Sequence, residues 1–301
     1  MYIINGKKIA SDILHDIRRT IVERNVTPGL AIILIGNDPS SEIYVKRKIH
    51  TADKAGITPH LYRFKATDSQ DDIIECIDFL NNDSDIHGII VQLPLPGHLN
   101  PDTLIQRIRP DKDADGFHPE NIKHLGDPSF PQPVTVMSVV ECLQNVLNTS
   151  PLRQLADSPY KGKGDVSPLQ RRKDVPLSAA IMCKSDILFI PLATLLSRQN
   201  IKADHFTELN KKCVQYDILI IALGKPHILT KEYTKKDAII IDVGISRIEH
   251  NGTTAIKGDA DIESLKKHAG AITPVPGGVG PVTVALLLKN TMNNCLNITK
   301  P

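Results

Sequence analysis

Short apolar runs separated by stretches of helical periodicity constrain the fold of this chain more than any other feature. Several of these runs are continuous stretches of Ile, Leu and Val, as expected for strands that are covered on both faces. Strands that alternate with helices along a chain form parallel α/β sheets. We therefore predict an α/β protein with strands at residues 30–36, 58–64, 87–93, 178–183, 217–223, 237–243 and 270–275.

The stretches between these runs repeat with the spacing of helices. Isoleucine recurs every fourth residue near the start of the chain, at positions 9, 13, 17 and 21. A second periodic stretch, residues 73–80, follows the sequence TDSQDD. Its serine and acidic residues are typical of a capped helix start. Both patterns predict helices between the strands.

Composition disfavours several classes of function. The net charge is +2 and aromatic residues make up 4% of the chain, so a basic, aromatic nucleic-acid surface is disfavoured. No apolar run reaches membrane-spanning length, and the N-terminus lacks the pattern of a secretory signal. The five cysteines have no CxxC spacing, which is typical of reduced thiols and suggests no metal site. We expect a cytoplasmic protein without a nucleic-acid or membrane partner.

One long segment breaks the alternation of strands and helices. Residues 150–176 are rich in Pro, Gly and charged residues and show no apolar period. This composition predicts a long, poorly ordered loop insert, with a domain boundary near it. Its basic residues could contact phosphate, but a solvated loop is the favoured interpretation.

The sequence NDPSSEIYVKRKIH, residues 37–50, follows the first predicted strand and begins a helix. Tyr44 and Lys48 are four residues apart and therefore share a helical face. A lysine can transfer protons near neutral pH if burial or a neighbouring cation lowers its pKa. The spacing alone favours a different interpretation, a basic surface helix with a tyrosine packed at its edge.

Two further polar groups stand where parallel strands present ligands, at or after a carboxyl end. Gln92 closes an apolar strand and could bind a substrate or a lysine, or cap loop backbone. The sequence PDKDADGFHP, residues 110–119, places three aspartates around a turn. It is not a calcium loop, because Ile122 stands where that loop needs Glu. A carboxylate here could instead accept hydrogen bonds from an amino-substituted heterocycle.

Two connections have the form strand, turn, helix. In residues 272–291 the turn is rich in Pro and Gly, which permits close backbone approach to a ligand, although an ordinary connection would have the same outline. In residues 179–196 a buried strand turns at residues 184–186 into an apolar helix that Pro191 is expected to introduce. An α/β protein usually holds a nucleotide phosphate at such a turn, yet this one contains no glycine.

Taken in order, these motifs resemble the bifunctional methylenetetrahydrofolate dehydrogenase/methenyltetrahydrofolate cyclohydrolase family. The resemblance lies in YVKRK, VQLPLP, PDKDADGFHP, ALGKP, IDVGISR and TPVPGGVGPVT and spans Gly6 to Thr291. It implies a two-lobed α/β protein with a folate-binding catalytic domain at residues 1–140 plus 280–301, to which the C-terminal helix returns. A Rossmann-like NAD(P)-binding domain would occupy residues 141–279, and the chain would form a homodimer through it. Folate and NADP would bind in a cleft between the lobes.

The resemblance also implies roles for single residues. Lys48 matches the catalytic lysine, Tyr44 the stacking tyrosine, Gln92 the glutamine that tunes the lysine, and Asp115 the acid that binds the pterin. The folate would be lined by Pro274, Val275, Pro276, Gly277 and Gly278. Two activities are implied: oxidation of 5,10-methylenetetrahydrofolate with NADP, and hydrolysis of 5,10-methenyltetrahydrofolate to 10-formyltetrahydrofolate.

Departures from the family pattern cluster on the nucleotide side. The family loop G-R-S-x-x-V-G-x-P reads C-K-S-D-I-L-F-I-P here, so Cys183 and Phe189 replace both glycines. Because Phe189 could fill the volume that a phosphate needs, we predict that the cyclohydrolase is more secure than the dehydrogenase. Local repacking that keeps the loop functional is the alternative, and a non-catalytic folate-binding relative is a third. The choice of NADP over NAD stays open, and the candidate cofactor residues are Cys183, Lys184, Ser185, His205 and Ile245.

Overall fold

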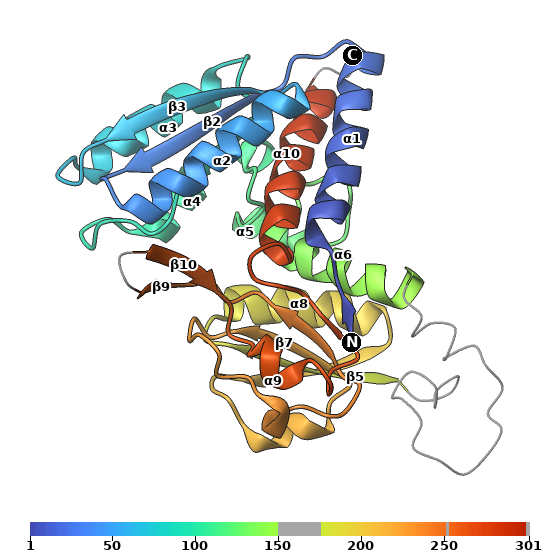
Figure 1. The fold of residues 1–301 in the computed structure, drawn as a ribbon. Coiled ribbons are helices and arrows are strands. Elements are labelled where there is room, and N and C mark those ends of the chain that lie inside the picture. Colours follow the sequence, from blue (N-terminus) through green and yellow to red (C-terminus); the bar gives the residue numbers. More distant parts are fainter. Residues whose placement is uncertain (150–175, 251–252, 299–301) are drawn as a thin grey trace. The chain divides into compact units, whose positions relative to one another are not determined.

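The structure, a computed structural model, describes residues 1–149, 176–250 and 253–298. The chain forms two compact units. The first comprises Met1–Ile9 with Thr135–Thr283, and the second comprises Ala10–Val134 with Val284–Pro301. Figure 1 follows the chain through its elements in order. The predicted insert at 150–176 lies outside the described residues except for Pro176.

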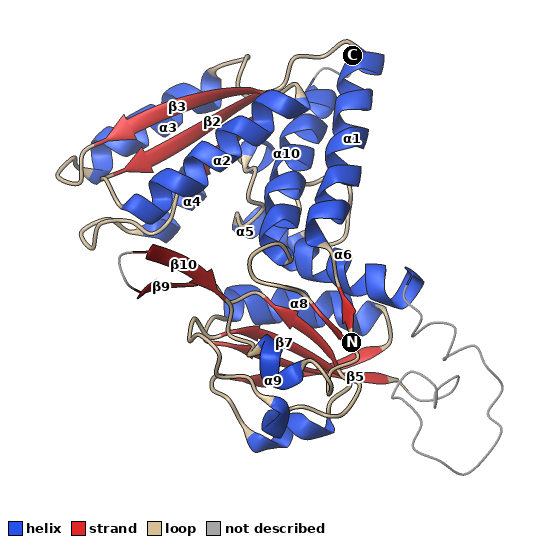
Figure 2. Cartoon of the chain, in the orientation of Figure 1, coloured by secondary structure: helices blue, strands red, loops and turns tan. Residues whose placement is uncertain are grey.

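A six-stranded sheet forms the centre of the first unit, and every neighbouring pair of its strands is parallel. The strand order is β1-β11-β8-β7-β5-β6. Figure 2 colours the strands red and labels β5 and β7 of this sheet. The parallel pairing confirms the prediction from the apolar runs. The strands are β1 (Tyr2–Ile3), β5 (Leu177–Cys183), β6 (Ile201–Phe206), β7 (Ile218–Ala222), β8 (Ile239–Asp242) and β11 (Ala271–Ile272).

Strand β1 places the N-terminus in this sheet. Tyr2 pairs with Ala271 and Ile3 with Ile272 of β11. The first residues therefore group with the nucleotide-side sheet, whereas the predicted division placed them with residues 10–140. The predicted borders at 140 and 280 fall inside two helices, α6 (Val134–Thr149) and α10 (Val279–Ile298).

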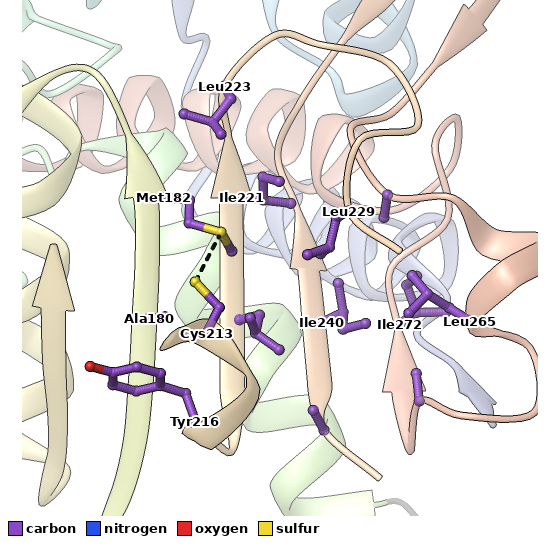
Figure 3. Packing of buried hydrophobic residues seen from close by; sticks show 14 residues of the cluster. Ala180, Met182, Cys213, Tyr216, Ile221, Leu223, Leu229, Ile240, Leu265 and Ile272 are labelled. Carbon is purple, nitrogen blue, oxygen red and sulfur yellow. Dashed lines mark hydrogen bonds between the residues drawn. The ribbon is translucent and has the colours of Figure 1, made fainter. Parts of the chain in front are cut away.

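Figure 3 shows the apolar core on one face of the six-stranded sheet. Side chains from alternate strand positions, including Met182, Ile221 and Ile240, pack there with Cys213 of η2 (Lys211–Gln215). The Cys213 Sγ lies 3.7 Å from the Met182 Sδ. Burying such side chains contributes about 1.5–3 kcal/mol each, which is why these runs carry almost no polar residue.

Helix α8 (Asp186–Arg198) begins earlier than the sequence analysis predicts. Ser185 caps it by accepting a hydrogen bond from the backbone N–H of Ile187 at 3.2 Å. Pro191 therefore lies inside the helix and does not introduce it. The prediction was wrong because Ser185, six residues before the proline, already caps the helix by satisfying a backbone N–H group of its first turn.

The rest of the first unit connects the strands. Its short helices are η2, η3 (Lys231–Tyr233) and α9 (Ile262–Leu265). An antiparallel hairpin of β9 (Ser246–His250) and β10 (Thr253–Lys257) follows the loop after β8.

The second unit contains a three-stranded parallel sheet in the order β3-β2-β4. Its strands are β2 (Gly29–Ile35), β3 (Thr58–Phe64) and β4 (Gly88–Val91). Its helices are α1 (Gly6–Arg24, from Ala10 on), α2 (Pro39–Ala55), α3 (Gln70–Asn82), α4 (Pro101–Arg107), η1 (Pro110–Lys112), α5 (Pro119–Lys123) and the later part of α10. Alternate β2 side chains pack against Ile73, Ile77 and Leu80 of α3. The predicted capped start of α3 is confirmed by a reciprocal capping box between Ser69 and Asp72.

Helix α10 ties the second unit together. Asn294 donates a hydrogen bond to the carbonyl of His87 at 3.1 Å, just before β4. Asn290 donates to the carbonyls of Ala114 and Gln132 at 3.0 and 2.8 Å. Asn290 thus fixes the loop that carries Asp115 to the C-terminal helix, and Asn294 fixes the start of β4 to it.

Two features are absent from the part of the chain that the structure describes. None of the helices described is long and apolar enough to cross a membrane. Within the same described ranges, no group of three or more His, Cys, Asp or Glu side chains could hold a metal ion.

Candidate functional site

Helix α2 positions the first two predicted site residues. Asp38 caps it by accepting a hydrogen bond from the backbone N–H of Ser41 at 2.7 Å, and Pro39 is its first residue. Tyr44 and Lys48 follow one turn apart, and both are partly buried. Their neighbours Lys46 and Arg47 are exposed. The helix therefore presents one lysine to the protein and leaves the other basic groups in solvent, which favours the site interpretation over the surface helix.

Gln92 meets Lys48 just beyond the end of β4. The Gln92 side-chain N–H donates to the carbonyl of Leu93 at 2.7 Å, which turns the amide oxygen toward Lys48. The Lys48 Nζ donates to that oxygen at 3.0 Å. An amide oxygen accepts this bond from either an ammonium or a neutral amine, so it holds the lysine in place in both protonation states.

Lys48 also interacts with Asp115, and burial perturbs both groups. Burial lowers the pKa of Lys48, and the negative charge of Asp115 opposes that fall. Burial raises the pKa of Asp115, and the positive charge of Lys48 opposes that rise. Two groups whose environments push them toward neutrality can exchange protons near neutral pH.

The loop that carries Asp115 is organised by a residue that the sequence analysis did not single out. The buried Asp113 carboxylate accepts hydrogen bonds from the backbone N–H groups of Gly116 and His118 at 3.0 and 2.7 Å, and from the Asn121 amide at 3.2 Å. Burial raises the pKa of Asp113 to about 6. The three clustered aspartates therefore have different partners, because Asp111 instead pairs with the exposed guanidinium of Arg109.

In the first unit, the turn between β5 and α8 holds three of the predicted cofactor residues. Cys183 is buried at the end of the strand, whereas Lys184 and Ser185 are exposed. The Ser185 hydroxyl accepts a bond from Ile187 and keeps its own hydrogen to donate. An exposed ammonium and hydroxyl at a capped helix N-terminus fit an anionic ligand such as a nucleotide phosphate.

Phe189, which stands in place of a glycine, packs against His205 of the neighbouring strand β6. The two rings are stacked with their centroids 4.2 Å apart and their planes at 8°. The His205 Nε2 lies 3.0 Å from the carbonyl oxygen of Cys183, which can only accept, so this nitrogen donates. Only the His205 Nδ1 is left to face a ligand, and it lies 4.0 Å from the Asp186 carboxylate.

The remaining predicted residues also lie in the first unit. Ile245 follows β8 with 46% of its side chain exposed. The loop Pro274–Gly278 follows β11, and Thr273 before it accepts a hydrogen bond from the Asp242 backbone N–H at 2.7 Å. The described structure thus brings Lys48, Gln92 and Asp115 together in one unit and Cys183 and His205 together in the other.

Together these features describe an α/β protein with a Rossmann-type nucleotide sheet in one unit and a buried lysine, amide and carboxylate in the other. Comparison with known families agrees with this class. The catalytic domain of tetrahydrofolate dehydrogenase/cyclohydrolase matches residues 4–115, and the NAD(P)-binding domain of the same family matches residues 169–298. The chain belongs to the tetrahydrofolate dehydrogenase/cyclohydrolase family.

Individual relatives match over nearly the whole length. The bifunctional protein FolD of Dichelobacter nodosus is 40% identical over 96% of this chain and 95% of its own. FolD of Zymomonas mobilis is 38% identical over 99% and 97%. The crystal structure of the Campylobacter jejuni FolD enzyme superposes with a TM-score of 0.82 at 32% identity, covering 99% of both chains. The Trypanosoma brucei enzyme, solved with NADP and an inhibitor, gives 0.83 at 28% identity over 100% and 99%.

Proposed function

We propose that this chain interconverts one-carbon derivatives of tetrahydrofolate. It oxidises 5,10-methylenetetrahydrofolate with NADP and hydrolyses the resulting 5,10-methenyl cation to 10-formyltetrahydrofolate. The observation that carries the proposal is the hydrogen bond of Lys48 to Gln92 beside Asp115, with burial lowering the pKa of the lysine. Membership of the family supports both activities.

Hydrolysis requires proton transfer at two places. Water adds to the methenyl carbon and loses a proton, and the carbon–N5 bond then breaks to leave the formyl group on N10. The net reaction releases one proton. A neutral Lys48 amine accepts a proton from the attacking water, and the ammonium can return one when the ring opens. Gln92 keeps the amine in place through both steps.

Substrate binding follows from the other residue types. The Asp115 carboxylate accepts charge-assisted hydrogen bonds from the amino and ring N–H groups of a pterin. Tyr44 offers a flat ring one helical turn from the amine. The loop residues Pro274–Gly278 supply apolar side chains and backbone to the folate.

NADP, when bound, accepts a hydride from the methylene carbon of the folate. Lys184 and Ser185 are the groups that we propose to hold its 2′-phosphate, with the Nδ1 of His205 as a third, and Ile245 would lie beside the nicotinamide. Cys183 would contribute backbone at the turn. These residues bind and orient the cofactor, because hydride transfer between two aligned flat ligands requires little other chemistry from the protein.

Two alternatives are distinguished by the same assays. The replacement of both loop glycines, with Phe189 stacked on His205, favours a cyclohydrolase that has lost the dehydrogenase step. A folate-binding relative without catalysis is the other alternative, which the Lys48–Gln92 contact disfavours. We further propose a cytoplasmic homodimer, which sedimentation of the purified protein would test.

The decisive experiment follows methenyltetrahydrofolate hydrolysis and NADP reduction by the same purified protein, with NADP and NAD titrated separately. The proposal expects hydrolysis that requires no dinucleotide and folate-dependent reduction of NADP. Hydrolysis without reduction or NADP binding would establish the cyclohydrolase-only alternative. Folate binding without either reaction would refute catalysis altogether.

A further inference from the structure

Two buried carboxylates lie in the first unit, and neither has been assigned a role so far. Asp242 is the last residue of β8 and is 2% exposed. Asp259 lies in the segment between β10 and α9 and is 0% exposed. Burying a carboxylate costs several kcal/mol unless hydrogen bonds compensate. Their partners therefore indicate what these two acids do.

Asp259 binds three consecutive backbone N–H groups in the loop that follows β7. Its carboxylate oxygens accept from Leu223, Gly224 and Lys225 at 2.6, 2.9 and 2.8 Å. Gly224 and Lys225 are exposed residues, yet their backbone N–H groups point inward to this buried carboxylate. Asp259 therefore fixes the course of the loop.

Asp242 in turn fixes Asp259. Its carboxylate accepts from the backbone N–H groups of Gly244, Asp259 and Ala260 at 2.9, 3.2 and 2.8 Å. A relay of carboxylates and amides therefore runs from the end of β8, through Asp259, to the loop after β7. We call this set, Asp242 and Asp259 with the amides they bind, the carboxylate relay.

The relay is packed without spare room. A side chain at Gly258 would place its Cβ 2.1 Å from an oxygen of the Asp242 carboxylate. A side chain at Gly244 would place its Cβ 2.2 Å from the Asp259 carboxyl carbon. Contacts this short do not occur, so both positions require glycine for the carboxylates to sit against the backbone.

The loop that the relay holds follows β7, and the place of β7 in the strand order suggests what the loop does. The chain leaves β5 through α8 to β6 on one side, and β7 lies on the other side of β5. The strand order thus reverses between β5 and β7. In open parallel sheets a ligand binds outside the carboxyl ends of the strands at such a switch point. The loop Leu223–Lys225 and the β5–α8 turn follow the two strands on either side of this switch point.

We infer that Asp259, held by Asp242, is a positioning residue for the dinucleotide, which fixes the loop Leu223–Lys225 against which the cofactor binds. This inference rests on the dehydrogenase activity proposed above. Asp259 is fully buried beneath the amides it binds, so it acts through the loop and not by touching the cofactor.

The test uses the two activities of one protein. In Asp259→Asn an amide NH2 replaces one oxygen and faces a backbone N–H donor, so at least one bond to the loop is lost. Hydrogen bonds to a charged group are worth enough that the KM for NADP should rise roughly tenfold. Hydrolysis of methenyltetrahydrofolate, which uses no dinucleotide, should keep its kcat/KM within about twofold of wild type.

Two further variants complete the design. Asp261→Asn is the matched control, because it removes a carboxylate two residues from Asp259. Asp261 caps α9 by accepting a hydrogen bond from the Ser264 N–H, and Asn can do the same. The KM of this variant for NADP should stay at the wild-type value. Gly224→Ala adds a side chain that meets nothing within 4 Å but disfavours the left-handed backbone, φ +67°, that the relay holds. Its KM for NADP should rise severalfold.

The outcomes separate the inference from the proposed function. A purely structural role for Asp259 would lower the amount or melting temperature of active protein and leave the KM for NADP unchanged, which would overturn the inference. If Asp259→Asn also lost hydrolysis through misfolding, Gly224→Ala would decide in the same way: a raised KM supports the inference and an unchanged KM refutes it. Wild-type protein that neither binds nor reduces NADP would refute the proposed dehydrogenase itself, and the inference with it.

Discussion

The lysine site of the second unit and the nucleotide turn of the first unit differ in how closely their residues match the family pattern. In the second unit Lys48 donates a hydrogen bond to Gln92 and interacts through its charge with Asp115. Each of these residue types suits the proposed proton transfer. At the nucleotide turn the strand, the serine cap and the helix remain, but side chains fill both positions where the family has glycine. A helix N-terminus depends on its cap, whereas close approach of a phosphate depends on the absence of side chains. The capped helix N-terminus can therefore persist although close approach of a phosphate is altered.

We expect the largest effect at the lysine site of the second unit. Lys48→Met removes the proton-transfer group and should lower the kcat of methenyltetrahydrofolate hydrolysis roughly a hundredfold to ten-thousandfold, the range of general acid–base catalysis. NADP binding, measured by titration, should not change. Lys46→Met is the matched control, because Lys46 is exposed on the same helix. Hydrolysis that survived in Lys48→Met would refute the catalytic role.

The second effect concerns pterin binding. Asp115→Asn removes a charged acceptor and should raise the KM for both folate substrates roughly tenfold to a hundredfold. Both activities are expected to fall together, because both use the same pterin. Asp111→Asn, which removes a carboxylate whose partner is the exposed Arg109, should leave both KM values unchanged. A loss confined to one activity would argue that Asp115 does not hold the pterin.

A third variant tests how Gln92 tunes the lysine. The neutral amine of Lys48 appears as the pH rises through its lowered pKa, so hydrolysis should increase with pH over that range. Gln92→Glu places a carboxylate beside the ammonium, stabilises it, and raises the pKa of Lys48 again. The rising limb of the pH–kcat profile should therefore move to higher pH, by about one unit. A shift to lower pH, or none, would contradict this account.

The smallest expected effect tests the nucleotide turn. Phe189→Ala opens the turn and frees His205, and the KM for NADP should fall severalfold. The protein should also become less stable by about 1–3 kcal/mol, because a partly buried ring and its stacking contact are lost. Ile190→Ala, at a neighbouring position that is 56% exposed, controls for the loss of apolar surface. An unchanged or raised KM in Phe189→Ala would show that the ring does not obstruct the cofactor.

Strands with continuous apolar runs were predictable, whereas most of the polar strands were missed. The strand β3, TPHLYRF, is an exception because it was predicted although it is only partly buried. The predicted runs at 30–36 and 58–64 are confirmed to within one residue as β2 and β3. The strand β6, Ile201–Phe206, was missed because it pairs only with β5 at the edge of its sheet and is mostly only partly buried, so it contains Lys, Asp and His. The polar hairpin of β9 and β10 was missed for a similar reason.

Some features of the candidate site were likewise visible in the sequence, and others were not. The spacing of Tyr44 and Lys48 on one helix is visible in the sequence, because four residues make about one helical turn. Asp113 carries a visible signal too, two residues before Asp115. No signal in the sequence predicts that Phe189 stacks on His205 or that Asp259 binds the loop at Leu223, because these pairs meet only through the order of strands in the sheet.

By itself the sequence determined many of the helices and parallel strands and the capped start of α3, because periodicity and caps act over a few neighbouring residues. Only the tertiary structure decided which polar groups meet. Lys48 and Gln92 are 44 residues apart, and Leu223 and Asp259 are 36 apart. Contacts at such separations depend on strand order and on the burial of both partners, and burial is also what lowers the pKa of Lys48.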